Sequence, residues 1–138
     1  MGNKITVAKP KISTYAVTGN SLKEIWADIQ KKHAAHAVTG DLTLTAMAQG
    51  AAFCGADVLI VTGASTGRAT DPEALQDAAV AGLPVAVGSG VSDLDAGLLA
   101  RDASALIVSS WIKQGGRWRN PVDVERVRTL RSVMEMAR

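Results

Sequence analysis

The sequence has little of what several protein classes require. A single cysteine, Cys54, excludes an internal disulfide framework and indicates a reducing compartment. The longest apolar runs, such as Val58–Val61, are far shorter than the roughly 20 residues of a membrane span. The first residues contain no apolar stretch of roughly 7–15 residues, so we expect no secretory signal. We therefore expect a cytoplasmic protein, at most peripheral to a membrane, with no transmembrane segment.

Charge and ligand-binding motifs are equally sparse. Lys and Arg together number 15 and Asp and Glu number 13, a net charge of +2 that does not indicate a nucleic-acid surface. Neither GxGxxG nor GxxxxGK[ST] is present, so the sequence predicts no dinucleotide fingerprint and no P-loop, and it assigns no cofactor. His33 and His36 lack a cysteine partner and an HExxH helix, so we predict no metal site.

What the sequence does contain is enough apolar material for one domain. Its 138 residues are 47% hydrophobic and 20% charged, which excludes a disordered or collagen-like chain. A complete (β/α)8 barrel usually needs about 250 residues, so this length is a little over half of one.

From residue 24 onward, segments typical of strands alternate with segments typical of helices. The predicted strands are Glu24–Gln30, Ala56–Thr62, Leu83–Val87 and Ser104–Val108. The predicted helices begin at Asp41, at Asp71 with Pro72 in first position, at Ser92 or Asp93, and at Val122, and they end near Gly55, Gly82, Arg101 and Ala137. Four strand–helix units predict an α/β domain over residues 24–138 with a parallel sheet. Residues 1–23 are expected to form an N-terminal arm or an extra strand.

Glycines and serines follow the last two predicted strands, where parallel α/β folds bind ligands. A short glycine turn between a strand and a helix leaves backbone N–H groups available to an anion, and barrels often bind phosphate after their last two strands. The sequence thus predicts a site for a small phosphorylated ligand, whose residues are Gly63, Thr66, Gly67, Gly88, Ser89, Gly90, Ser109, Ser110 and Lys113. The alternative, that Gly88 and Gly90 only form a tight turn, is equally open.

The candidate acid–base groups lie in and just after the first predicted strand, where a charge such as that of Asp28 is costly in a core strand unless it is paired. Asp28 and Lys32 lie on one face of it by the two-residue period, and His33 titrates near neutral pH. The alternative is a structural Asp28 followed by a solvated loop. Cys54 is expected to be a small buried residue, and Trp111 and Trp118 are expected to cover either a pocket or the core.

Four segments resemble one known family, in the same order. They are ADIQKKHA at Ala27–Ala34, GADVLIVTG at Gly55–Gly63 with Thr66-Gly67, LPVAVGSGV at Leu83–Val91, and SSWIK followed by NPVD and Arg126-Val127 between Ser109 and Val127. These segments are similar to the conserved patterns of the BtpA family, which includes photosystem I biogenesis proteins.

The resemblance implies a fold and two functions. Family members are thought to be TIM barrels of roughly twice this length, so the resemblance implies a half (β/α)8 TIM barrel, completed by dimerisation; the alternative is an open flavodoxin-like parallel sheet. Four parallel strands cannot close a barrel and leave two open edges, so we expect a homo-oligomer. One implied function is handling a small phosphorylated metabolite in a reaction that the sequence does not name. The other is a non-catalytic biogenesis or assembly factor for a membrane complex such as photosystem I.

Overall fold

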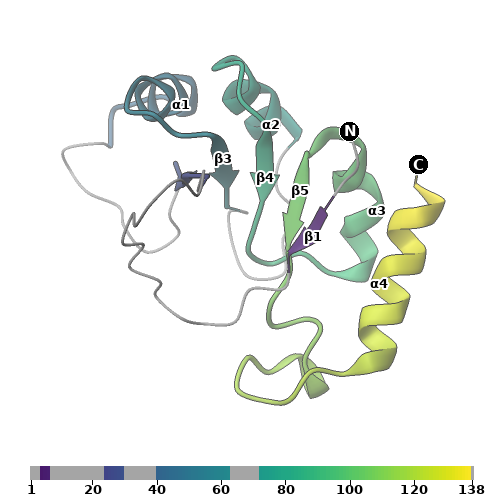
Figure 1. The fold of residues 1–138 in the computed structure, drawn as a ribbon. Helices are drawn as coiled ribbons and strands as arrows, with labels where there is room; N and C mark the ends of the chain where they lie inside the picture. The colour runs from purple at the N-terminus through teal and green to yellow at the C-terminus, as the bar shows by residue number, and fades with distance from the viewer. Residues whose placement is uncertain (1–3, 7–23, 30–39, 63–71, 138) are drawn as a thin grey trace.

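The computed structural model describes residues 4–6, 24–29, 40–62 and 72–137. Short strands alternate with helices along these residues (Figure 1). The elements are β1 (Lys4–Thr6), β2 (Trp26–Asp28), α1 (Leu44–Phe53), β3 (Val58–Val61), α2 (Pro72–Ala79), β4 (Val85–Val87), α3 (Asp93–Asp102), β5 (Ala105–Ile107), η2 (Gln114–Gly116) and α4 (Val124–Met136). The predicted α/β class and the four strand–helix units are confirmed.

The strands form one parallel sheet in the order β1-β5-β4-β3-β2. Leu59 of β3 is in register with Val85 of β4, and Val87 of β4 with Leu106 of β5. The N-terminal strand β1 pairs with β5, so the expectation of two open edges on a four-stranded sheet is wrong at the β5 side. Among the described strands, β2 is at the other edge of the sheet.

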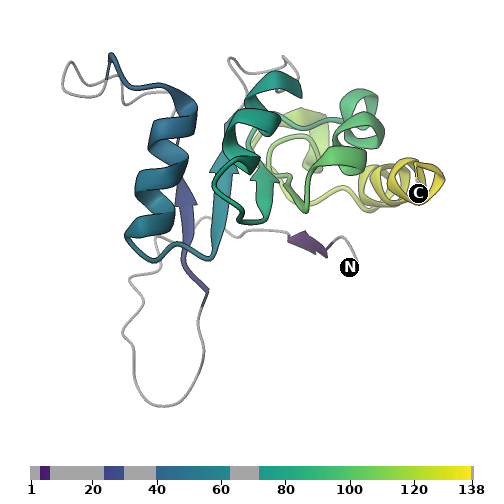
Figure 2. The same ribbon diagram turned by 90° about the horizontal axis from the view of Figure 1, so that it is seen from above.

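All four helices cover the same face of the sheet. Leu59 and Val61 of β3 pack in one cluster with buried residues of every helix, such as Ala48 of α1 and Leu130 of α4. Val58 belongs instead to a smaller cluster on the opposite face, made of strand residues alone. In Figure 2 the helices follow one another in an arc around the strands. Because a flavodoxin-like sheet carries helices on both faces, this layering favours the barrel-related arrangement.

Local capping explains where the helices begin. The hydroxyl of Thr43, not the carboxylate of Asp41, caps α1 by accepting the Ala46 N–H at 3.1 Å, so the predicted cap is wrong by two residues. Pro72 opens α2 as predicted, where its missing N–H has no intrahelical partner. Ser92 precedes α3, and Asp123 caps α4 by accepting two backbone N–H groups.

Cys54 is exposed, which corrects the expectation of a buried residue. It is the C-cap of α1 and its N–H donates to the Gly50 carbonyl. Gly55 follows with a φ of +91°, a conformation that turns the chain away from the helix axis. The position beyond the last turn leaves the thiol outside the packed face of α1.

Candidate functional site

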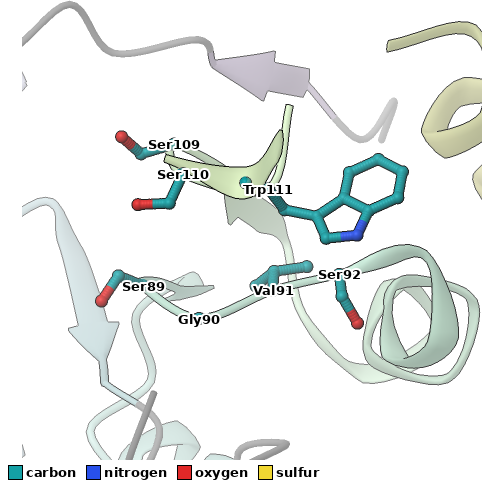
Figure 3. Close-up of a pocket in the computed structure, with 8 residues that line it drawn as sticks. Ser89, Gly90, Val91, Ser92, Ser109, Ser110 and Trp111 are labelled. Carbon is teal, nitrogen blue, oxygen red and sulfur yellow. The ribbon is translucent and has the colours of Figure 1, made fainter. Parts of the chain in front are cut away.

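A cavity of about 290 Å³ opens where β4 and β5 end (Figure 3). Because the strands are parallel, their carboxyl ends meet at one edge of the sheet, which is where the sequence predicted a ligand. The loop after β4 and the loop after β5 supply its lining, which consists of Ser89, Gly90, Val91, Ser92, Ser109, Ser110, Trp111 and Gly116. The structure therefore brings together four predicted site residues: Ser89, Gly90, Ser109 and Ser110.

The glycines of the β4–α3 turn have structural reasons of their own. A Cβ at position 88 would lie 2.6 Å from the Cβ of Ile107 in β5, a separation that real side chains do not reach. Gly90 has a φ of +88°, which disfavours any residue with a side chain. Gly88 is thus required by close packing and Gly90 by backbone conformation; Gly90 lines the cavity, and Gly88 is not part of the lining.

Three successive backbone donors lie in this turn. The N–H of Gly88 donates to the Val61 carbonyl at 3.1 Å, which ties the turn to β3. The N–H groups of Ser89, Gly90 and Val91 find no acceptor among the described residues. A run of unpaired N–H groups at a strand end is the arrangement that binds anions in parallel α/β folds.

The N-terminus of α3 is already occupied by a carboxylate. Asp95 Oδ1 accepts the backbone N–H of Ser92 at 2.6 Å and its hydroxyl at 3.1 Å. Asp93 places a second acidic side chain in the same first turn. The negative charge of these groups disfavours a second anion at the helix end, so the hydrogen-bond donors available to an anion are those on the serine side of the cavity.

The serine side is formed by three hydroxyl groups. Figure 3 shows the side chains of Ser89, Ser109 and Ser110 on one side of the cavity and the ring of Trp111 on the other. Ser110 is exposed and Ser109 is half-buried. A serine hydroxyl donates and accepts hydrogen bonds, so this side can contact phosphate oxygens without carrying charge.

Hydrogen bonds fix the loop that follows β5. Lys113 N–H donates to the Ser110 carbonyl at 3.0 Å, and Asp123 N–H donates to the Ile112 carbonyl at 2.8 Å. Ile112 is only 1% exposed and anchors the loop in the core. Lys113 pairs through its backbone with Val122 and is not part of the cavity lining, so its predicted role as a phosphate ligand stays a prediction.

The aromatic side of the cavity is braced from α4. Arg126 Nη1 donates to the Trp111 carbonyl at 2.8 Å, and its guanidinium carbon lies 5.3 Å from the centre of the Trp111 ring. Trp111 is half-buried, lines the cavity and also packs against the hydrophobic core, so both alternatives hold for this residue. Trp118 is exposed and is not part of the cavity lining. Sequence reasoning had placed neither Gly116 nor Arg126 at the site, because only the folded loop brings α4 to it.

Asp28 lies at the carboxyl end of β2. The cavity opens at the same end of the strands, but Asp28 is not part of its lining. Its side chain is exposed, and the Thr62 hydroxyl donates to its two carboxylate oxygens at 3.3 and 3.4 Å. The sequence treated Asp28 as a charge in a core strand; in the structure β2 is an edge strand, so its carboxylate reaches water. Thr62, which is buried, is a partner that the sequence analysis had not singled out.

Several predicted site residues lie outside the described residues. They are Lys32 and His33 after β2, and Gly63, Thr66 and Gly67 after β3. His36 is also outside them. Their assigned roles stay predictions.

The fold and the position of the cavity define a class: a parallel α/β protein related to the TIM barrels, with its candidate site at the carboxyl ends of the strands. Within that class, the sequence model of the BtpA family matches residues 7–136, so the chain belongs to the BtpA family. The family assignment made from the four sequence segments is confirmed.

Two similar proteins illustrate how much of its relatives this chain covers. An uncharacterized mitochondrial protein of Caenorhabditis elegans is 42% identical over 104 residues, which cover 75% of this chain and 37% of that protein. An uncharacterized protein of Pyrococcus abyssi is 34% identical over 116 residues, 83% of this chain and 44% of its own length. The chain thus spans less than half the length of these relatives. No solved structure gives a significant match.

Proposed function

We propose that this chain binds a small phosphorylated metabolite in the cavity between the carboxyl ends of β4 and β5. The observation that supports this most is that Ser89, Gly90 and Val91, whose N–H groups have no acceptor among the described residues, line one cavity together with Ser109 and Ser110. Backbone N–H groups and serine hydroxyls together supply the donors that phosphate oxygens accept. The reaction that follows binding is not assigned.

The acid–base part of the proposal concerns the opposite half of the same sheet edge. Asp28, with Lys32 and His33 after it, would act on the part of the ligand that is distant from its phosphate. β2 and β4 are separated by β3, and two strand spacings amount to about 10 Å. A ligand that reaches both regions is therefore longer than a phosphate ion, with its reactive atoms toward β2.

The proposal is tested by calorimetry and thermal unfolding with inorganic phosphate and a panel of sugar and nucleotide phosphates. A ligand present at 100 times its dissociation constant stabilises the fold by about 2.7 kcal/mol. The informative variant is Ser110→Asp, which places a negative charge in the cavity at an exposed position. Since like charges a few ångströms apart repel by about 1–4 kcal/mol, we expect phosphate binding to weaken about tenfold or more.

The matched control is Ser132→Asp, which adds the same charge at an exposed position of α4. It should leave phosphate affinity unchanged. If no phosphate compound stabilises the wild-type chain, or if both variants bind phosphate as the wild type does, the proposed site is wrong.

The second candidate function is a non-catalytic assembly factor for a membrane complex such as photosystem I. The observation that favours it is a pair of apolar side chains one turn apart on α3: Leu94 is 92% exposed and Leu98 is 54% exposed. None of the described helices is long and apolar enough to cross a membrane. Loss of complex assembly in a Leu94→Ser, Leu98→Ser variant that still binds phosphate would support this function over the first.

We also propose that the chain forms a homo-oligomer. Among the described strands, β2 is the last strand of the sheet on its side, and a strand edge is a template for pairing with another chain. Light scattering at micromolar concentration should give at least twice the chain mass of 14.3 kDa. A monomer that unfolds cooperatively would contradict this proposal, and it would leave the proposal of a phosphate site unaffected.

A further inference from the structure

The feature that carries a further inference is the half-buried guanidinium of Arg126. Arg126 lies in the first turn of α4, where its backbone N–H donates to the Asp123 carboxylate at 3.3 Å. One side-chain nitrogen donates to the Trp111 carbonyl, and the group lies over the Trp111 ring. The hydrogen bond and the ring contact together hold the positive charge in one place.

That place is directly behind the wall of the cavity. Trp111 and Gly116 both line the cavity, and the guanidinium lies over the Trp111 ring. A Cβ added to Gly116, whose φ is +69°, would lie 3.6 Å from Arg126 Nη1. Only a ring and a glycine backbone therefore separate this charge from the space that a ligand would fill.

The charge of Arg126 has no carboxylate partner among the described residues. The ion pairs found there are Arg128 with Glu125 and Arg131 with Glu135, both on the exposed side of α4. A partly buried cation without a counter-ion is unfavourable unless a ligand supplies the negative charge. The Asp95 carboxylate is held by Ser92, which lies beside Trp111 in Figure 3, and among the described residues no ion pair joins it to Arg126.

We infer that Arg126 sets the charge selectivity of the cavity, favouring a dianionic phosphate monoester over a monoanionic diester. This inference rests on the proposed function. Arg126 acts through its field, with Trp111 as the group that positions it. The attraction between Arg126 and the ligand is proportional to the charge on the ligand. Removing the charge of Arg126 therefore changes the logarithm of the dissociation constant twice as much for a dianion as for a monoanion.

The test compares methyl phosphate with dimethyl phosphate by calorimetry at about pH 8, where the monoester is a dianion. We expect Arg126→Gln to weaken binding of methyl phosphate about tenfold and of dimethyl phosphate about threefold, because Coulomb energies scale with ligand charge. Arg126→Lys keeps the charge and should keep the ratio of the two affinities within about twofold. The control is Arg128→Gln on the same helix, which should change neither affinity.

The outcomes separate the two proposals. Suppose that the wild type binds methyl phosphate, and that Arg126→Gln weakens the binding of both compounds by the same factor or leaves both affinities unchanged. The inference about Arg126 is then overturned, while the proposed phosphate site still stands. If a folded Arg126→Lys loses the ratio, the inference is also overturned, even where Arg126→Gln fails to fold. If the wild type binds neither compound, the proposed function itself fails.

Discussion

The two halves of the sheet's carboxyl edge are built differently. At the β4–β5 half, the strand residues Val85, Ala86 and Val87 are all buried, and hydrogen bonds fix the loops on both sides of the cavity. At the β2–β3 half, Asp28 is exposed, and its carboxylate accepts a hydrogen bond from the Thr62 hydroxyl at 3.3 and 3.4 Å. The difference indicates that the half proposed to bind an anion is preformed, whereas the half proposed to carry the acid–base groups is open to water at Asp28.

The largest effect is expected from Gly88→Ala, at the centre of the preformed half. The added methyl group would overlap Ile107 Cβ, which is attached to the β5 backbone and cannot rotate away. Overpacking of this kind costs about 1–3 kcal/mol, and we expect that loss in urea unfolding together with weaker phosphate binding.

The control for that variant is Gly50→Ala in α1, where nothing lies within 4 Å of the added group. Because alanine favours a helix interior over glycine, it should stabilise the chain by about 0.5–1 kcal/mol. Equal unfolding midpoints for Gly88→Ala and the wild type would show that the β4–β5 half is not tightly packed.

A smaller effect is expected from Thr62→Val, which removes the donor to Asp28 in the open half. The net value of such a hydrogen bond is about 0.5–1.5 kcal/mol, and the exposure of Asp28 places the expected loss at the lower end. Phosphate affinity should not change, since Thr62 is not part of the cavity lining.

A double-mutant cycle with Asp28→Asn isolates this contact. A coupling energy of zero would show that the two side chains do not interact in solution. A fall in phosphate affinity for Thr62→Val alone would show that the two halves are coupled and that the contrast between them is wrong.

The most local effect is expected at the start of α1, the helix that links β2 and β3. Thr43→Ala removes the cap and should destabilise the chain by about 1 kcal/mol, whereas Asp41→Ala, outside the helix, should change stability by a few tenths at most. Thermal unfolding of both variants is sufficient. A larger loss of stability for Asp41→Ala than for Thr43→Ala would show that Asp41 caps the helix, as the sequence predicted.

The fold could be read from the sequence because its signals are local. Continuous apolar runs marked the buried strands β3, β4 and β5, and Pro72 and Ser92 marked helix starts that the structure confirms. The cap of α1 was misplaced because Asp41 and Thr43 are both good caps, and only the backbone geometry distinguishes them. The pairing of β1 with β5 was left open, since a short strand beside a distant segment leaves no periodic signal.

The site was predictable where the strands themselves position it. The rule that parallel strands end at one edge brought Ser89, Gly90, Ser109 and Ser110 together correctly. The exposure of Asp28 was missed, because it depends on which strand lies at the edge and not on the strand's own sequence. Arg126 was missed as a site residue because it reaches the cavity from a helix, through the folded loop before α4.

The most direct test of the account is a titration of the wild-type chain with inorganic phosphate, followed by amide chemical shifts in NMR. The account predicts that the amides of Ser89, Gly90 and Val91 move first and saturate, because their N–H groups are the unpaired donors of the cavity. The amides of Asp28 and Ile29, in the open half, should stay in place with phosphate alone. Saturable shifts at Asp28 without shifts at Ser89–Val91 would contradict the account.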